Sequence, residues 1–129
     1  ADGTVTAGTS APLSDGSGFV VLMSGDKVKE LVVTHIARFV GFKAVGVEPK
    51  IIVIAPANAI PEVLSPSNLF VEDIYLIVFN EAFASQTIAS ITEVGLDISR
   101  TNVNGGAIAL GHPLGATGAM LTARLLNEM

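Results

Sequence analysis

The chain has 129 residues, no cysteine and a formal net charge of −5, so it is long enough for one domain with its core and cannot form a disulfide or a thiolate metal site. Half of its residues are hydrophobic and only 15% are charged, against about a quarter in typical proteins, which indicates a chain that buries surface against something larger. The negative charge argues against a nucleic-acid partner, the interrupted apolar runs argue against a membrane span, and the cytoplasm is the default location.

The first third of the chain predicts a loop, a strand, a helix and a second strand. Glycine, serine and proline fill residues 1–18, which indicates a loop. The apolar run 19–23 is typical of a buried strand. Charged and apolar residues alternate at helical spacing over 26–31, with Ser24 or Asp26 as N-cap. Residues 36–47 predict a strand with one wetter face.

The middle of the chain predicts a short extended segment, a helix and a buried strand. Residues 49–55 are apolar and β-branched, which favours an extended segment. Residues 56–64 predict a helix, in which Pro61 must lie near the start or produce a kink. A turn over 65–70 leads to six apolar residues at 74–79, which predict a buried strand.

The last third predicts two helices around a short strand. Asn80 is suited to cap a helix that runs to about Val94, where Gly95 is a fitting terminator. A short strand is expected near 103 and over 107–110. The final helix, 113–128, is apolar on nearly every side, so we expect it to be buried. This alternation predicts an α/β fold, a parallel β-α-β-α-β-α unit with a largely buried last helix.

The segment from Asn102 to Gly118 is the most informative in the chain. Its glycines allow positive φ or close backbone approach, and Pro113 presets a φ suited to the first turn of a helix. His112 therefore lies on a glycine-hinged turn that enters a helix, where its ring can face a ligand. For an isolated histidine, a helix cap or one core hydrogen bond is the commoner explanation.

This segment resembles the thiolases, which cleave or form 3-ketoacyl-CoA. The thiolase signature Asn-x-x-Gly-Gly-Ala-Ile-Ala-Leu-Gly-His-Pro-x-Gly matches from Asn102 onward. Further matches are Asn80-Glu-Ala-Phe-Ala84, the Asn-Glu-Ala-Phe motif of that family, and Asp2-Gly-Thr-Val-Thr-Ala-Gly8 followed by Leu13-Ser-Asp-Gly16. The motifs occur in the family's order, and the resemblance covers essentially the whole chain.

The resemblance implies a truncated thiolase layer. Residues 1–34 would be the end of the N-terminal half, and residues 35–129 would be a C-terminal half without its last two strands. The implied activity is C-acyl transfer in fatty acid metabolism: 3-ketoacyl-CoA plus CoA giving acyl-CoA plus acetyl-CoA, or the reverse condensation. Coenzyme A would be a substrate, with no separate cofactor and no metal. The expected partners are acyl-CoA and either a second copy of the chain or a complementary thiolase segment.

The resemblance also assigns roles to individual residues. His112 would bind the thioester oxygen in an oxyanion hole, and Asn80 would hold a water that completes it, although a plain helix N-cap is the alternative for Asn80. Phe83 and Ala7 would flank the pantetheine channel, and Phe83 is most simply a core residue. Glu81 is assigned a supporting role as an acid in the first turn of a helix.

Both thiolase cysteines, the acyl-accepting nucleophile and the acid/base, are absent from this chain. No other residue here replaces a thiolate as acyl carrier, so the chain alone is expected to be inactive. Several positions also depart from the family pattern: Thr9, Ala11, Val53, Ala55 and Met120. The alternative is a non-catalytic remnant or interaction module that self-associates or pairs with a complementary thiolase half. A phosphate binder is disfavoured, because the glycine-rich loops lack a Walker lysine and the G-x-G-x-x-G spacing.

Overall fold

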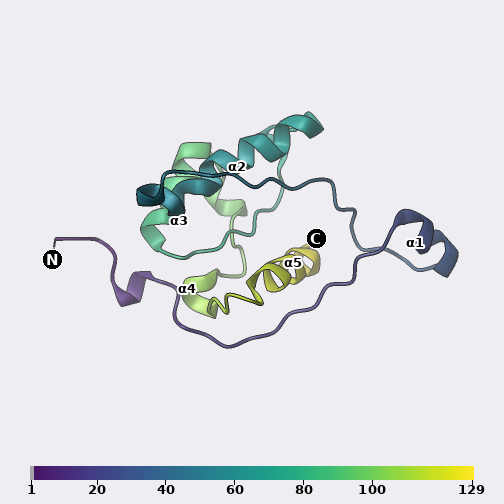
Figure 1. Ribbon diagram of the computed structural model, residues 1–129, viewed down its shortest axis with the longest axis horizontal. Helices are drawn as coiled ribbons and strands as arrows, with labels where there is room; N and C mark the ends of the chain where they lie inside the picture. Colours follow the sequence, from purple (N-terminus) through teal and green to yellow (C-terminus); the bar gives the residue numbers. More distant parts are fainter. Residues whose placement is uncertain (1) are drawn as a thin grey trace.

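A computed structural model describes residues 2–129, in which helices are joined by long extended segments (Figure 1). The α-helices are α1 (Gly25–Leu31), α2 (Ala55–Leu64), α3 (Ala84–Val94), α4 (Ala107–Leu110) and α5 (Thr117–Glu128). The 3₁₀ helices are η1 (Ala7–Thr9), η2 (Pro49–Ile54), η3 (Ser65–Ser67), η4 (Val71–Asp73) and η5 (Ile98–Arg100).

A small apolar core lies between α2, α3 and the segment that precedes α3. Phe79, Ile91 and Leu96 are buried in it. Partly buried apolar side chains surround these three: Ile60, Val71, Ile77 and Val94. In Figure 1, α2 and α3 lie together, α4 and α5 form a second group below them, and α1 stands apart at the end of two extended segments. The candidate site described below is formed by the segment before α3 and the turn between α4 and α5.

The predicted parallel sheet is not confirmed for the described residues, which contain two isolated bridges. Ile77 pairs with Thr101 in parallel, and Ser10 pairs with Phe83 in antiparallel. At the parallel bridge, the Ile77 N–H donates to the Arg100 carbonyl and the Asn102 N–H donates to the Ile77 carbonyl, each at 2.9 Å. The segments 19–23 and 36–47 lie outside any helix and have no paired strand. A strand is stabilised by its partner's hydrogen bonds, so propensity alone did not produce the sheet.

Two segments predicted to be extended are helical. Residues 49–54 form η2, two short 3₁₀ turns that begin at Pro49 and are separated by a kink at Ile51, and residues 107–110 form α4 rather than a strand. Proline suits the first position of a helix because its N–H would be unpaired there anyway. At α4, the Ile108 N–H has an acceptor in the Glu81 carboxylate at 3.2 Å, which favours a helix start over an extended chain.

The predictions for α1 and α2, and for the end of α3, are confirmed. The Ser24 hydroxyl accepts a hydrogen bond from the Lys27 N–H at 3.2 Å and so caps α1. Helix α2 carries Pro61 in its second half, so the expectation that this proline lies near the helix start is wrong. Helix α3 ends at Gly95, which has φ of 75°. Its start was misplaced, because α3 begins at Ala84 with Phe83 in the N-cap position, and Asn80 does not cap it.

The last helix begins later and is more exposed than predicted. Pro113 opens a turn, in which its carbonyl accepts from the Ala116 and Thr117 N–H groups at 2.9 Å each, and α5 starts at Thr117. No residue of α5 is buried, so the predicted burial is wrong: nothing in the described chain covers the outer side of this apolar helix. Other large side chains are exposed too, such as Phe19 at 88% and Phe42 at 80%. Among residues 2–129, no helix has both the length and the apolar character to cross a membrane.

Candidate functional site

The backbone of His112 is held by the N-terminal segment of the chain. Gly111 has φ of 96°, and a Cβ there would collide with the side chain of Ser14. The His112 N–H donates to the Ser14 hydroxyl at 3.3 Å, and that hydroxyl donates to the Pro12 carbonyl at 2.9 Å. Glycine is therefore required at 111 both for its φ and for the close approach, as predicted.

Both nitrogens of the half-buried His112 ring have partners. Nδ1 lies 2.8 Å from the Thr117 hydroxyl, and Nε2 lies 3.4 Å from Nδ2 of Asn80. The ring is therefore oriented by one contact within its own turn and one contact to the segment that precedes α3. The structure brings together His112 and Asn80, which the sequence pointed to separately.

Asn80 follows the buried Phe79 directly and points its side chain toward His112 rather than toward a helix terminus. Its Oδ1 is buried and has no hydrogen-bond partner. A buried amide oxygen without a donor is costly, since such groups in folded proteins are almost always paired. The polar side chain therefore keeps an unused acceptor beside the histidine.

A carboxylate connects the two motifs that carry the site. Glu81 Oε1 accepts from Nδ2 of Asn102 at 2.7 Å, and its Oε2 accepts from the Ile108 N–H at 3.2 Å. A Cβ at the buried Gly106 would overlap this carboxylate. Glu81 was expected at the first turn of the following helix; it lies instead at the start of α4, where a negative charge is also favourable.

Phe83 and Ala7, which were predicted to flank a channel, lie at or near the bridge between Ser10 and Phe83. Phe83 is partly exposed and forms the antiparallel bridge with Ser10, while the Ala11 N–H donates to the Ala82 carbonyl at 3.0 Å. Ala7 is exposed on η1, three residues before Ser10. Neither Phe83 nor Ala7 makes a hydrogen bond to His112 or Asn80.

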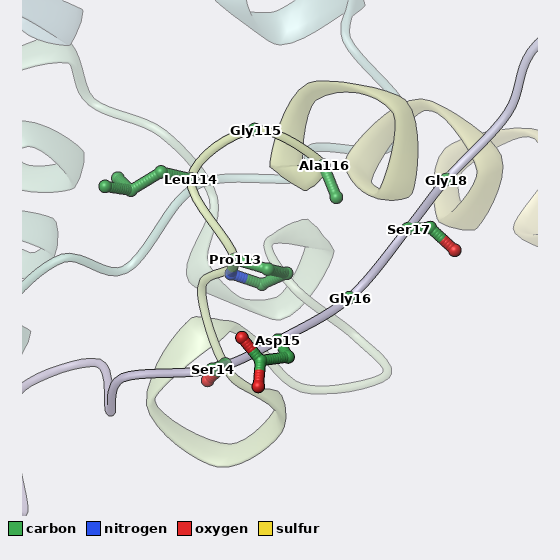
Figure 2. Close-up of a pocket in the computed structure, with 9 residues that line it drawn as sticks. All are labelled: Ser14, Asp15, Gly16, Ser17, Gly18, Pro113, Leu114, Gly115 and Ala116. Carbon is green, nitrogen blue, oxygen red and sulfur yellow. The ribbon is translucent and has the colours of Figure 1, made fainter.

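Two hollows flank the site without including the histidine ring. One, of about 380 Å³, lies between the extended segment 14–18 and the turn 113–116 (Figure 2). Figure 2 shows the Pro113 ring against the segment at Gly16, and the Leu114 side chain pointing away from it. The other, of about 600 Å³, is mostly apolar and includes Asn80 and Lys43 in its lining. These volumes are in the range of small-molecule sites.

Sequence reasoning missed the residues that hold the site in place. Thr117 and Ser14 both bond to His112, yet neither was singled out. The available signal was spacing. Pro113 starts a helical turn after His112, so the hydroxyl of Thr117, five residues after the histidine, comes close to its ring. Among residues 2–129, no group of three or more metal-ligating side chains could hold a metal ion.

Comparisons with known proteins describe the same region. The family profile described as "Thiolase, C-terminal domain" matches residues 33–129. The 3-ketoacyl-CoA thiolase of Bacillus subtilis is 50% identical over 128 residues, which cover 99% of this chain and 33% of that protein. The crystal structure of human mitochondrial 3-ketoacyl-CoA thiolase in complex with CoA has a TM-score of 0.90 and 44% identity, covering 98% of this chain and 32% of that one. The dimeric peroxisomal thiolase of Saccharomyces cerevisiae has a TM-score of 0.92 and 40% identity, covering 99% and 33%. The chain thus spans about a third of the length of these relatives.

Proposed function

The chain belongs to the thiolase family, and we propose that it supplies the oxyanion-binding side of a thiolase-type C-acyltransferase. The reaction would cleave 3-ketoacyl-CoA with CoA into acyl-CoA and acetyl-CoA, or run the reverse condensation. The similarity to 3-ketoacyl-CoA thiolases supports this substrate class. Coenzyme A is a substrate in this proposal, not a resident cofactor.

The observation that carries the proposal is the approach of His112 Nε2 to Asn80 Nδ2 at 3.4 Å. An oxyanion hole needs hydrogen-bond donors close to the oxygen on which charge develops, and a protonated Nε2 together with a water held by the Asn80 amide would supply two of them. Nε2 donates there when the ring carries a second proton. His112 would contact the thioester oxygen, and the Asn80 amide would hold the water that completes the hole.

The rest of the substrate would extend toward the N-terminal segment. Phe83 and Ala7 would flank the pantetheine arm, and the Ser10–Phe83 bridge supports a common edge for them. Ala11 lacks the hydroxyl that many thiolases use to contact CoA. Each missing hydrogen bond costs roughly 0.5–1.5 kcal/mol, so the loss of several would bring the affinity for acetyl-CoA to the millimolar range, about −4 kcal/mol.

The 129-residue chain alone would not turn over substrate, because it contains no cysteine to carry the acyl group. Residues 1–34 would belong to the N-terminal half of the enzyme and residues 35–129 to its C-terminal half. Complete catalysis would need the cysteine-bearing segments of a thiolase. We keep the cytoplasm as the predicted location, although the names of relatives include mitochondrial and peroxisomal forms.

A second candidate function is that of a non-catalytic module that self-associates or pairs with a complementary thiolase half. The contiguous run of exposed apolar residues from Phe19 to Met23 favours this reading, since a large exposed apolar patch marks an interaction surface. Sedimentation of the pure chain tests it. A stable monomer at low concentration, with a sharp thermal transition, would count heavily against an interaction module.

Calorimetric titration with acetyl-CoA tests the first proposal. We expect weak binding by the parent chain and a roughly two- to tenfold loss in His112→Ala, the effect of one hydrogen bond. His35→Ala is the matched control, because His35 is exposed on an extended segment, and it should bind as the parent does. Absence of binding at millimolar ligand, or equal binding by His112→Ala, contradicts the proposal. Thiolysis of acetoacetyl-CoA by the pure chain would contradict the requirement for a cysteine.

A further inference from the structure

The hydroxyl of Thr117 lies between the His112 ring and a backbone carbonyl. Oγ1 is 2.8 Å from Nδ1 of His112 and 2.8 Å from the carbonyl oxygen of Pro113. Thr117 is the first residue of α5, so its position is fixed by the helix as well as by these two contacts. No step of the proposed reaction has yet used this side chain.

The proton count decides the direction of both hydrogen bonds. A threonine hydroxyl carries one proton, whereas the Pro113 carbonyl has none to give. If the hydroxyl donated to Nδ1, two oxygen lone pairs would face each other at 2.8 Å with no proton between them. The arrangement is favourable only when Oγ1 donates to the carbonyl and accepts from an N–H at Nδ1.

We propose that Thr117 is a positioning residue that keeps a proton on Nδ1 of His112, so that Nε2 is the only ring position that gains or loses a proton. The hydrogen bond at one ring nitrogen sets which tautomer a histidine adopts. In the neutral ring, Nε2 then accepts from Nδ2 of Asn80, with which it is in contact. In the protonated ring, Nε2–H becomes a donor.

This inference deepens the proposed function and rests on it for its chemical meaning. If His112 binds a thioester oxygen, it does so only as the doubly protonated ring, because the neutral ring directs a lone pair toward the site. Because of Thr117, Nε2 of His112 accepts a proton when the ring is neutral and donates a hydrogen bond to the oxyanion when the ring is protonated. The tautomer of His112 is a property of the chain without ligand, so it can be measured independently of acetyl-CoA binding.

The test is long-range ¹H–¹⁵N correlation NMR of the histidine rings in the 129-residue chain, at a pH where the imidazoles are neutral. We expect a pyrrole-type Nδ1 and a pyridine-type Nε2 for His112, while the exposed His35 shows the mixture of free imidazole. His35→Gln assigns the signals. In Thr117→Val the ratio of the two tautomers should move toward that of free imidazole by roughly two- to tenfold, the equivalent of one hydrogen bond. Thr117→Ser should keep the parent ratio.

Thr122→Val is the matched control. The Thr122 hydroxyl makes the same bond to the carbonyl four residues earlier, Gly118, at 2.8 Å, but has no histidine partner. The proposal is overturned if the parent chain has the proton on Nε2, if Thr117→Val leaves the ratio unchanged, or if Thr122→Val changes it equally. A chain that gives both histidines the ratio of free imidazole, as an unfolded chain would, also overturns it. If NMR shows the expected tautomer but calorimetry shows no binding of acetyl-CoA, the proposed function is rejected and the positioning role of Thr117 stands.

Discussion

The side-chain amide of Asn102 pairs with both backbone polar groups of Phe79: Oδ1 accepts from the Phe79 N–H at 2.7 Å, and Nδ2 donates to the Phe79 carbonyl at 2.9 Å. The amide thus continues the pairing that the backbone begins at Ile77 and Thr101. The second proton of Nδ2 reaches Glu81 at 2.7 Å. One side chain therefore fixes the residue before Asn80 and the carboxylate after it.

Replacing Asn102 with alanine should destabilise the chain by about 4 kcal/mol, about 3 from three lost hydrogen bonds, one of them to a charged group, and about 1 from backbone strain. Asn68→Ala is the control. Both asparagines have positive φ, 49° and 52°, but no hydrogen bond of the Asn68 side chain is present in the structure, so its replacement should cost only about 1 kcal/mol of backbone strain. Urea unfolding measures both. Equal losses would show that the Asn102 side chain contributes no more than its backbone conformation.

Gly106→Ala should destabilise the chain by about 1–3 kcal/mol. Its backbone (φ −118°, ψ −166°) is accessible to any residue, so the cost is steric: the added methyl displaces the Glu81 carboxylate from Asn102 and Ile108. Gly118→Ala is the comparison. It lies inside α5 with no atom near its Cβ position, and it should stabilise by about 0.5–1 kcal/mol. Thermal unfolding should show a lower melting temperature for Gly106→Ala and a higher one for Gly118→Ala than for the parent chain.

Ser90→Ala should leave stability unchanged or raise it by about 1 kcal/mol. Ser90 is fully buried on α3, and its hydroxyl has no partner, so the methyl group removes an unpaired polar atom. Thr87→Val on the same helix should instead lose about 1 kcal/mol, because the Thr87 hydroxyl donates to the Phe83 carbonyl at 3.1 Å. A marked loss in Ser90→Ala, measured by denaturant unfolding, would show that its hydroxyl is paired.

The pKa of the exposed Asp97 carboxyl lies below its ordinary value, because the Ser99 hydroxyl and the Ser99 N–H donate to it and Arg100 adds a favourable charge. A lowered pKa in the folded state gives stability that is present above the unfolded pKa and is lost as the pH falls through the folded one. Ser99→Ala should raise the pKa of Asp97 in an NMR titration. Thr101→Val is the control, since the Thr101 hydroxyl bonds only to the Asp97 backbone carbonyl. A pKa that is equal in the parent and in Ser99→Ala contradicts the assigned cause.

Local signals in the sequence were sufficient where a few neighbouring residues determine the structure. Ser24 caps α1 and Gly95 ends α3 because caps act within one turn. The left-handed conformations of Gly105 and Gly111 were likewise readable from the motif. His112 and Asn80 were identified from their motifs, and their contact at 3.4 Å is what the structure adds.

The failures concern features that depend on distant partners. The apolar runs 19–23 and 36–47 resemble buried strands, yet no other segment of the described chain pairs with them. Helix α5 has a buried helix's composition and none of its residues is buried. Composition reports what a segment is suited to contact, whereas burial requires the contacting surface to be present. Thr117 escaped notice for a similar reason, because its role depends on the direction of a neighbouring ring.

The link from Ser14 to His112 joins residues 98 positions apart, and this separation has a kinetic consequence. Closing so long a loop costs chain entropy before any contact repays it, and such distant pairs form late in folding. The Asn102–Phe79 pairing, 23 positions apart, should form well before it. On a ribosome, Ser14 emerges long before its partner has been synthesised. The scaffold around Asn80 should therefore assemble first, and Ser14 should fix the backbone N–H of His112 only in the last stage of folding.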